Sequence, residues 1–189
     1  MQPILDERIK GHQGFGLIQL FTGNGKGKTT AATGEMIRAV GAGKRVGVVY
    51  FDKGGESHYF ERDVLRKLGV DVVATGRDRI DLVTSRFDFS ISDFDKTEAA
   101  RGIVEVERMF DAGYDLVVMD EINSTTNLGM IALKDVLVLL DRKPMKTELV
   151  LTGRNAPQEF FDRAHLVSDV CLRKHYFYSG VKARGGLDY

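Results

Sequence analysis

The sequence contains little cysteine, no excess charge and no long apolar run, and each absence excludes a class of protein. Cys171 is the single cysteine among 189 residues, so it can form no internal disulfide and gives no cysteine metal cluster, which suits a reducing cytoplasm. Twenty-seven basic and 27 acidic side chains cancel, which argues against nucleic acid or an acidic membrane as a partner. No segment approaches the roughly 18 apolar residues of a membrane span, and residues 1–7 lack a signal-peptide core. We therefore expect a cytoplasmic protein that binds neither membrane nor nucleic acid.

Short apolar runs alternate with segments of helical spacing along the chain. Continuous apolar runs predict strands covered on both faces, as in a parallel sheet. The predicted strands are 17–22, 46–51, 70–74, 116–119, 149–152 and 166–172, and the last of these makes Cys171 a core residue. The predicted helices are 29–40, 59–68, 95–112 and 133–140, and a glycine follows each of the first three. This alternation predicts a three-layer α/β fold.

The length and the 43% hydrophobic content fit one domain over residues 1–189 with a full-sized core. Residues 1–13 are expected to form either a mobile segment over the active site or a frayed end. The stretch 75–92 is rich in Arg, Asp and Ser and has no clear periodicity. A loop of that length within a compact domain is more often functional than accidental.

A glycine-rich loop follows the first predicted strand and leads directly into the first predicted helix. Its sequence is Thr22-Gly23-Asn24-Gly25-Lys26-Gly27-Lys28-Thr29-Thr30, which has the strand–loop–helix context of a P-loop. The glycines let consecutive N–H groups face one anion, and the helix N-terminus and Lys28 add positive charge. We predict that Gly23 through Thr30 bind ATP or a similar triphosphate, that Thr29 offers its hydroxyl to Mg²⁺, and that Lys26 lies either near the phosphates or in solvent. A glycine-rich turn without a ligand is the alternative, which the flanking strand and helix disfavour.

Two other predicted strands end in charged residues. Asp120 and Glu121 follow strand 116–119, where one carboxylate can hold magnesium and the other can orient a nucleophile or substrate. A helix N-cap or a solvated strand end is the alternative, and the P-loop about 90 residues earlier favours the metal site. Arg154 follows strand 149–152, and its planar guanidinium suits either a phosphate or a surface acid. These features predict a P-loop NTPase-like (RecA-like) domain with catalytic Lys28, Thr29 and Glu121.

Taken in order, the motifs resemble those of the P-loop type of ATP:corrinoid adenosyltransferases of the cobalamin pathway. The resemblance runs from about residue 16 to residue 189 and includes the substitution of Thr22 for the first glycine of the loop. The other matching segments are Phe51-Asp52-Lys53-Gly54, Asp120-Glu121, Thr152-Gly153-Arg154, Lys174-His175 and Gly180-Val181-Lys182-Ala183. The resemblance implies that the 5′-deoxyadenosyl group of ATP moves to the Co(I) of a reduced corrinoid, with release of inorganic triphosphate. It also implies Mg²⁺, an electron-donating reductase and a homodimer.

Phe87 and Phe89 occupy the place of the family's corrinoid-contacting segment, with Phe89 where the family has tryptophan. The resemblance implies that these rings cover the lower face of the corrin, and the alternative is that they anchor the loop in the core. Three other functions stay open. The protein could be an ATPase switch, a small-molecule kinase acting at the γ-phosphate, or a corrinoid-binding relative without efficient transfer.

Overall fold

A parallel sheet forms the centre of the computed structural model, which describes residues 4–55, 59–79, 88 and 90–188. Within these ranges six strands pair in the order β3-β2-β4-β5-β1-β6, and every pairing is parallel. The strands are β1 (Ile18–Thr22), β2 (Val46–Tyr50), β3 (Asp71–Ala74), β4 (Leu116–Asp120), β5 (Glu148–Thr152) and β6 (Leu166–Asp169). All six were predicted, and only β6 is much shorter than expected.

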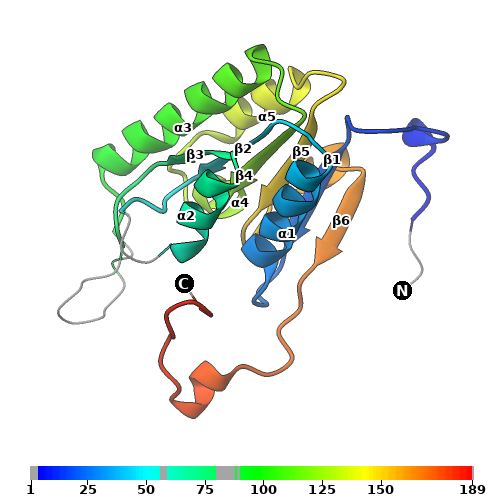
Figure 1. Ribbon diagram of the computed structural model, residues 1–189. Helices are drawn as coiled ribbons and strands as arrows, with labels where there is room; N and C mark the ends of the chain where they lie inside the picture. Colours follow the sequence, from blue (N-terminus) through cyan, green and yellow to red (C-terminus); the bar gives the residue numbers. More distant parts are fainter. Residues whose placement is uncertain (1–3, 56–58, 80–87, 89, 189) are drawn as a thin grey trace.

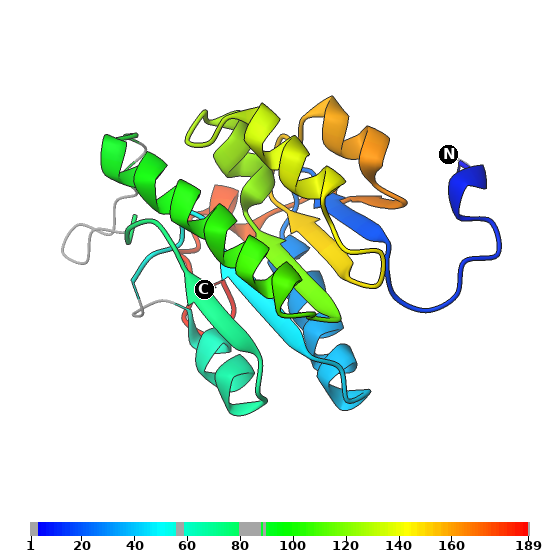
Figure 2. The ribbon, with the colours of Figure 1, turned by 90° about the horizontal axis from the view of Figure 1, so that it is seen from above.

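Helices cover both faces of this sheet, so the predicted three-layer architecture is confirmed. Figures 1 and 2 show α1 (Lys28–Gly41) and α2 (Phe60–Lys67) on one face and the remaining α-helices on the other. Those are α3 (Asp93–Asp111), α4 (Ile122–Asn127), α5 (Leu133–Asp141) and α6 (Gln158–Arg163). Single 3₁₀ turns, η1 (Glu7–Ile9) and η2 (Tyr176–Ser179), lie near the two ends. The helices α4 and α6 were not predicted, because six residues are too few to display a helical period.

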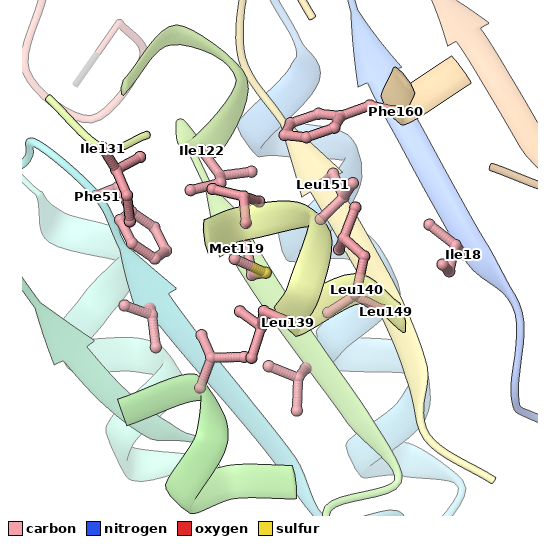
Figure 3. Close-up of a cluster of buried hydrophobic side chains, with 14 of the residues drawn as sticks. Ile18, Phe51, Met119, Ile122, Ile131, Leu139, Leu140, Leu149, Leu151 and Phe160 are labelled. Atoms are coloured by element: carbon pink, nitrogen blue, oxygen red, sulfur yellow. The ribbon is translucent and has the colours of Figure 1, made fainter. Parts of the chain in front are cut away.

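The strands carry continuous apolar runs because each face of the sheet has its own core. In β2, Val48 and Tyr50 pack towards α1 and α2, whereas Val49 packs towards α3. Figure 3 shows the larger core, in which Met119 and Leu139 lie between the sheet and its helices. Central strands thus bury both sets of alternating side chains, which explains the absence of a hydrophobic–polar alternation.

The sixth strand departs from this pattern. Within the described ranges it pairs with β1 alone, at the edge of the sheet, and Leu166 and Val167 remain 43% and 44% exposed. The strand ends at Asp169, so Cys171 lies beyond it and is exposed. The prediction that Cys171 belongs to the core is therefore wrong, because an apolar run at a sheet edge lacks a second neighbouring strand to bury it.

The N-terminal segment lies beside the amino end of β6, away from the carboxyl edge of the sheet. Arg8 donates to the carbonyl oxygens of Asp162 at 2.8 Å and Ala164 at 3.2 Å, which connects η1 to the end of α6. His165 joins the start of β6 to β1, since its Nδ1 accepts a hydrogen bond from the Ile18 N–H at 2.9 Å. Among the described residues, no helix combines the length and the hydropathy that crossing a bilayer requires.

Candidate active site

The carboxyl ends of the parallel strands meet at one edge of the sheet, where the segments that follow β1, β2, β4, β5 and β6 enclose a cavity of about 910 Å³. The residues predicted to bind ATP line it together. They are Asn24, Gly25, Lys26, Gly27, Lys28, Thr29, Thr30 and Arg154. Glu121, predicted as a catalytic residue and metal ligand, lines the same cavity. Gly23 lies next to them, on a second cavity of about 520 Å³ that also has Asn24 and Arg154 in its wall. Segments up to 130 residues apart in sequence therefore converge where the sequence predicted a triphosphate site.

The P-loop packs tightly against the chain that leaves β6. Gly23 and Gly27 have φ angles of +95° and +123°, which favour glycine. The Gly25 N–H donates to the Val170 carbonyl oxygen at 2.6 Å, and a Cβ on Gly25 would lie at 2.6 Å from that same oxygen. Backbone shape at this loop is thus determined by steric contact with residues about 145 positions later.

Substitution of Gly25 by alanine should weaken ATP binding by at least about tenfold, because the added methyl group must displace the Val170 backbone or the loop itself. Isothermal titration calorimetry with ATP measures the effect. Gly34→Ala is the matched control, since a Cβ on this helical glycine meets no atom within 4 Å. Equal ATP affinity in Gly25→Ala and wild type would contradict the role assigned to this packing.

Lys28 lies folded into the loop that precedes it. Its Nζ donates to the carbonyl oxygens of Gly23 and Gly25, both at 2.8 Å, and the residue is 7% exposed. Burial lowers the pKa of Lys28, and the carboxylate of Glu121 opposes that shift. The ammonium group is therefore already held at the centre of the loop, where a bound phosphate would meet it.

The two acids at the end of β4 occupy different environments. Asp120 is 1% exposed; its Oδ1 accepts from the Thr152 hydroxyl at 2.6 Å, and its Oδ2 accepts from Lys53 Nζ at 2.6 Å. Glu121 faces the cavity with a φ of 63°, and its Oε2 accepts from the Ser124 hydroxyl at 2.5 Å. Asp120 is thus the buried acid beside the loop, and Glu121 is the accessible one.

Lys53 joins the two halves of the site, and it was not among the predicted site residues. Its Nζ also donates to Thr29 Oγ1 at 3.2 Å, so one ammonium group bridges the P-loop and β4. Burial would lower the pKa of Lys53, but the nearby charges of Asp120 and Glu121 raise it well above its usual range. The sequence did contain a signal for Lys53: this lysine comes soon after a buried strand, as do Asp120 and Arg154, and the ends of parallel strands meet at one edge of the sheet.

Among the described residues, three that are not glycine adopt positive φ angles, and all three follow strands at this edge. They are Asp52 at 52° after β2, Glu121 at 63° after β4 and Asn155 at 54° after β5. Such conformations cost on the order of 1–3 kcal/mol each and cluster at functional sites. Within the described chain the strained positions therefore all lie at this edge of the sheet, and one of them, Glu121, lines the cavity.

The C-terminal segment, which Figure 1 shows below α1 and α2, contributes residues between 175 and 188 to one side of the cavity wall. Lys26 Nζ lies 3.0 Å from an Asp188 carboxylate oxygen and donates to the Leu187 carbonyl. His175 caps η2, because its Nδ1 accepts from the Phe177 N–H at 3.1 Å. Neither the contact of Lys26 with this segment nor the segment's place in the cavity wall was predicted.

Comparison with known proteins identifies the family. Residues 14–189 match the family described as ATP:corrinoid adenosyltransferase BtuR/CobO/CobP. The chain belongs to this family. Corrinoid adenosyltransferases of Escherichia coli K12 and Salmonella typhimurium are each 39% identical to it, over 92% of this chain and 86% of theirs. That of Pseudomonas aeruginosa is 32% identical over 100% of this chain and 91% of its own length.

The fold is also found in a more distant structure. A KaiC-like protein of Pyrococcus horikoshii superimposes with a TM-score of 0.52 at 19% identity, covering 88% of this chain and 77% of that one. This likeness supports the predicted RecA-like P-loop architecture. Membership of the adenosyltransferase family confirms the predicted reaction class, adenosyl transfer from ATP to a corrinoid. The γ-phosphate ATPase and kinase alternatives are not favoured.

The predicted corrinoid residues of this adenosyltransferase, Phe87 and Phe89, lie outside the described residues, but both flanks of their segment are described. The Asp88 N–H donates to the Arg79 carbonyl oxygen at 2.8 Å. Arg79 is 2% exposed and forms ion pairs with Asp52 at 2.7 Å and Asp95 at 3.2 Å. Buried ion pairs thus fix the flanks next to Lys53 and the carboxyl edge of β2.

Proposed function

We propose that this adenosyltransferase holds the triphosphate of ATP on its P-loop and exposes the ribose C5′ to the Co(I) of a reduced corrinoid. The cobalt lone pair forms the Co–C5′ bond as the C5′–O5′ bond breaks, and the bonding electrons leave with inorganic triphosphate. The convergence of the P-loop and Glu121 on one cavity carries this proposal, with the buried Asp120 joined to the cavity wall through Lys53. Because the corrinoid supplies the nucleophile, the protein needs only to align the reactants and stabilise the leaving group.

The site residues divide by what they can offer to a triphosphate. The loop N–H groups from Gly23 to Thr30 and the Lys28 ammonium stabilise the charge that grows on the leaving group. Arg154 is exposed at the rim of the cavity, where its guanidinium can reach a terminal phosphate. Glu121 faces the same space and is suited to orient the ribose or a bound water.

The site also fits Mg²⁺. Thr29 Oγ1 and the Asp120 carboxylate already share one cation, the Lys53 ammonium, and hard oxygen donors of this kind suit magnesium. Once bound, the metal would neutralise negative charge on the triphosphate. Among the described residues no cluster of three His, Cys, Asp or Glu side chains could hold a metal, so phosphate and water oxygens would complete the shell. We assign Thr29 and Asp120 as its protein ligands, with Glu121 as the nearest further carboxylate.

The decisive experiment is product analysis with ATP and chemically reduced corrinoid. Inorganic triphosphate should appear only when both substrates are present, in a one-to-one ratio with the adenosylated corrinoid. Release of ADP and phosphate without corrinoid would instead support the hydrolytic alternative. Formation of neither product, with ATP and corrinoid both bound, would support a corrinoid-binding relative without transfer.

Phe89→Ala should lower turnover of the corrinoid by at least about tenfold while ATP affinity stays unchanged, because a large apolar ring that covers the corrin would be lost. The rate of adenosylated corrinoid formation and calorimetry with ATP measure the two effects. Phe94→Ala is the control, since Phe94 is 56% exposed on α3 and absent from the cavity wall. Unchanged turnover in Phe89→Ala would refute the role proposed for Phe89.

Three further features belong to this proposal. Co(I) is strongly reducing, so an electron-donating reductase is expected to supply it. We also propose that the protein is a homodimer, on the basis of the family resemblance. We propose a cytoplasmic location because its single cysteine suits a reducing compartment. Light scattering coupled to size-exclusion chromatography measures the oligomeric state directly.

A further inference from the structure

A lysine ammonium group occupies the centre of the proposed metal site. Lys53 Nζ lies 2.6 Å from Asp120 Oδ2, 3.2 Å from Thr29 Oγ1 and 3.5 Å from Glu121 Oε1. These are the same three side chains that were predicted from the sequence as metal ligands. A cation thus already sits among the oxygens that would surround Mg²⁺.

The backbone of Lys53 is held firmly, whereas its side chain has room to move. Its N–H donates to the Thr75 carbonyl oxygen at 2.9 Å, and its own carbonyl accepts from Arg62. The Arg62 guanidinium lies 3.9 Å from the ring centre of Tyr59 and 4.6 Å from that of Tyr50. The Lys53 side chain itself lines the large cavity and is 18% exposed. Its flexible four-carbon stem therefore allows the ammonium group to turn into the space where a triphosphate would lie.

The Asp120 carboxylate needs a cation at all times. It is 1% exposed, and an isolated buried carboxylate is costly. Two cations, however, cannot share its Oδ2, because Lys53 and a divalent ion within 3 Å of each other would repel strongly at low dielectric. The metal and the Lys53 ammonium group must therefore exclude one another at this position.

We propose that Lys53 is an internal counter-ion of the metal site: it neutralises Asp120 in the ligand-free protein, and the incoming metal–ATP complex displaces it towards the triphosphate. This inference rests on the metal site proposed above. Displacement becomes favourable only when an anion arrives to receive the ammonium group. Metal binding is thereby coupled to nucleotide binding, and the free metal is rejected.

The test measures Mn²⁺, as a spectroscopic substitute for Mg²⁺, by electron paramagnetic resonance. Wild type should bind Mn²⁺ weakly alone and tightly with ATP. Lys53→Met should bind Mn²⁺ without nucleotide at least about tenfold more tightly than wild type, because the competing cation is gone. Lys44→Met is the matched control, since it removes a lysine that pairs with Asp115 at 3.6 Å, far from the site, and should behave as wild type. The double variant Lys53→Met/Asp120→Asn should lose this tighter binding of Mn²⁺, because the carboxylate that would hold the metal is gone.

The melting temperature provides a second readout. Lys53→Gln provides a second variant in case Lys53→Met folds poorly. Both variants should melt at a lower temperature than wild type without metal and recover with Mn²⁺ alone, whereas wild type should not respond to Mn²⁺ alone. If ATP fails to increase Mn²⁺ binding in wild type, the metal site is wrong, and the counter-ion role is overturned with it. If ATP does increase it but neither Lys53 variant gains affinity for Mn²⁺ alone, the metal site stands and the counter-ion role of Lys53 is overturned.

Discussion

Lys28→Ala should reduce kcat/KM for adenosyl transfer by about 10²–10³-fold, the range seen when one preorganised donor to a developing anion is removed. Lys28 is 7% exposed and is held at 2.8 Å from both Gly23 O and Gly25 O, so its charge lies at the centre of the loop before ATP arrives. No other described lysine is enclosed by the loop in this way. The leaving triphosphate would lose its nearest full positive charge.

Two measurements separate this effect from a general loss of structure. Triphosphate release with ATP and reduced corrinoid gives kcat/KM, and circular dichroism reports the fold. Lys44→Ala removes the same positive charge from a position outside the cavity wall, and this control variant should retain wild-type kinetics. A Lys28→Ala protein that is folded and within about threefold of wild-type kcat/KM would show that the loop amides alone hold the triphosphate.

The features that the sequence predicted well are those encoded by local pattern. The P-loop, the parallel strands and the acids after β4 each combine a short apolar run with neighbouring residues that need no distant partner to be recognised. Their placement then follows from topology, because parallel strands bring their carboxyl ends to one edge. The gathering of Lys28, Thr29 and Glu121 around one cavity follows from this rule.

The features that were missed depend on contacts between distant segments. Lys53 and Asp120 are 67 positions apart, and no local sequence pattern indicates that a lysine after β2 will contact an acid at the end of β4. The pairing of Lys26 with Asp188 spans nearly the whole chain in the same way. Cys171 was misplaced for a related reason: an apolar run indicates a strand but does not reveal whether that strand lies at the centre or at the edge of the sheet.

Asp95→Ala should destabilise the protein by about 3–5 kcal/mol, the usual cost of removing one partner from a buried ion pair. The Asp95 side chain is fully buried and forms ion pairs with Arg77 at 3.0 Å and Arg79 at 3.2 Å. It also completes the capping box at the start of α3, where its Oδ2 accepts from the Ser92 N–H at 2.7 Å. Urea unfolding followed by circular dichroism measures the loss. Asp93→Ala on the same helix is the control, because the Asp93 side chain is 99% exposed and should change stability by less than about 0.5 kcal/mol.

The same carboxylate predicts a pH dependence. Burial alone would raise the pKa of Asp95, but the Ser92 hydrogen bonds and the two arginines outweigh it and hold the pKa below its ordinary value of 3.8. A depressed pKa means that the stabilisation is complete above the pKa of the unfolded chain and is lost as the pH falls through the folded value. The difference in unfolding free energy between wild type and Asp95→Asn should therefore be constant from pH 7 to about pH 5 and shrink below about pH 4. A difference that stays constant down to pH 3 would mean that Asp95 stabilises α3 by its shape and capping geometry, and that its charge does not anchor Arg77 and Arg79 at the flank of the predicted corrinoid segment.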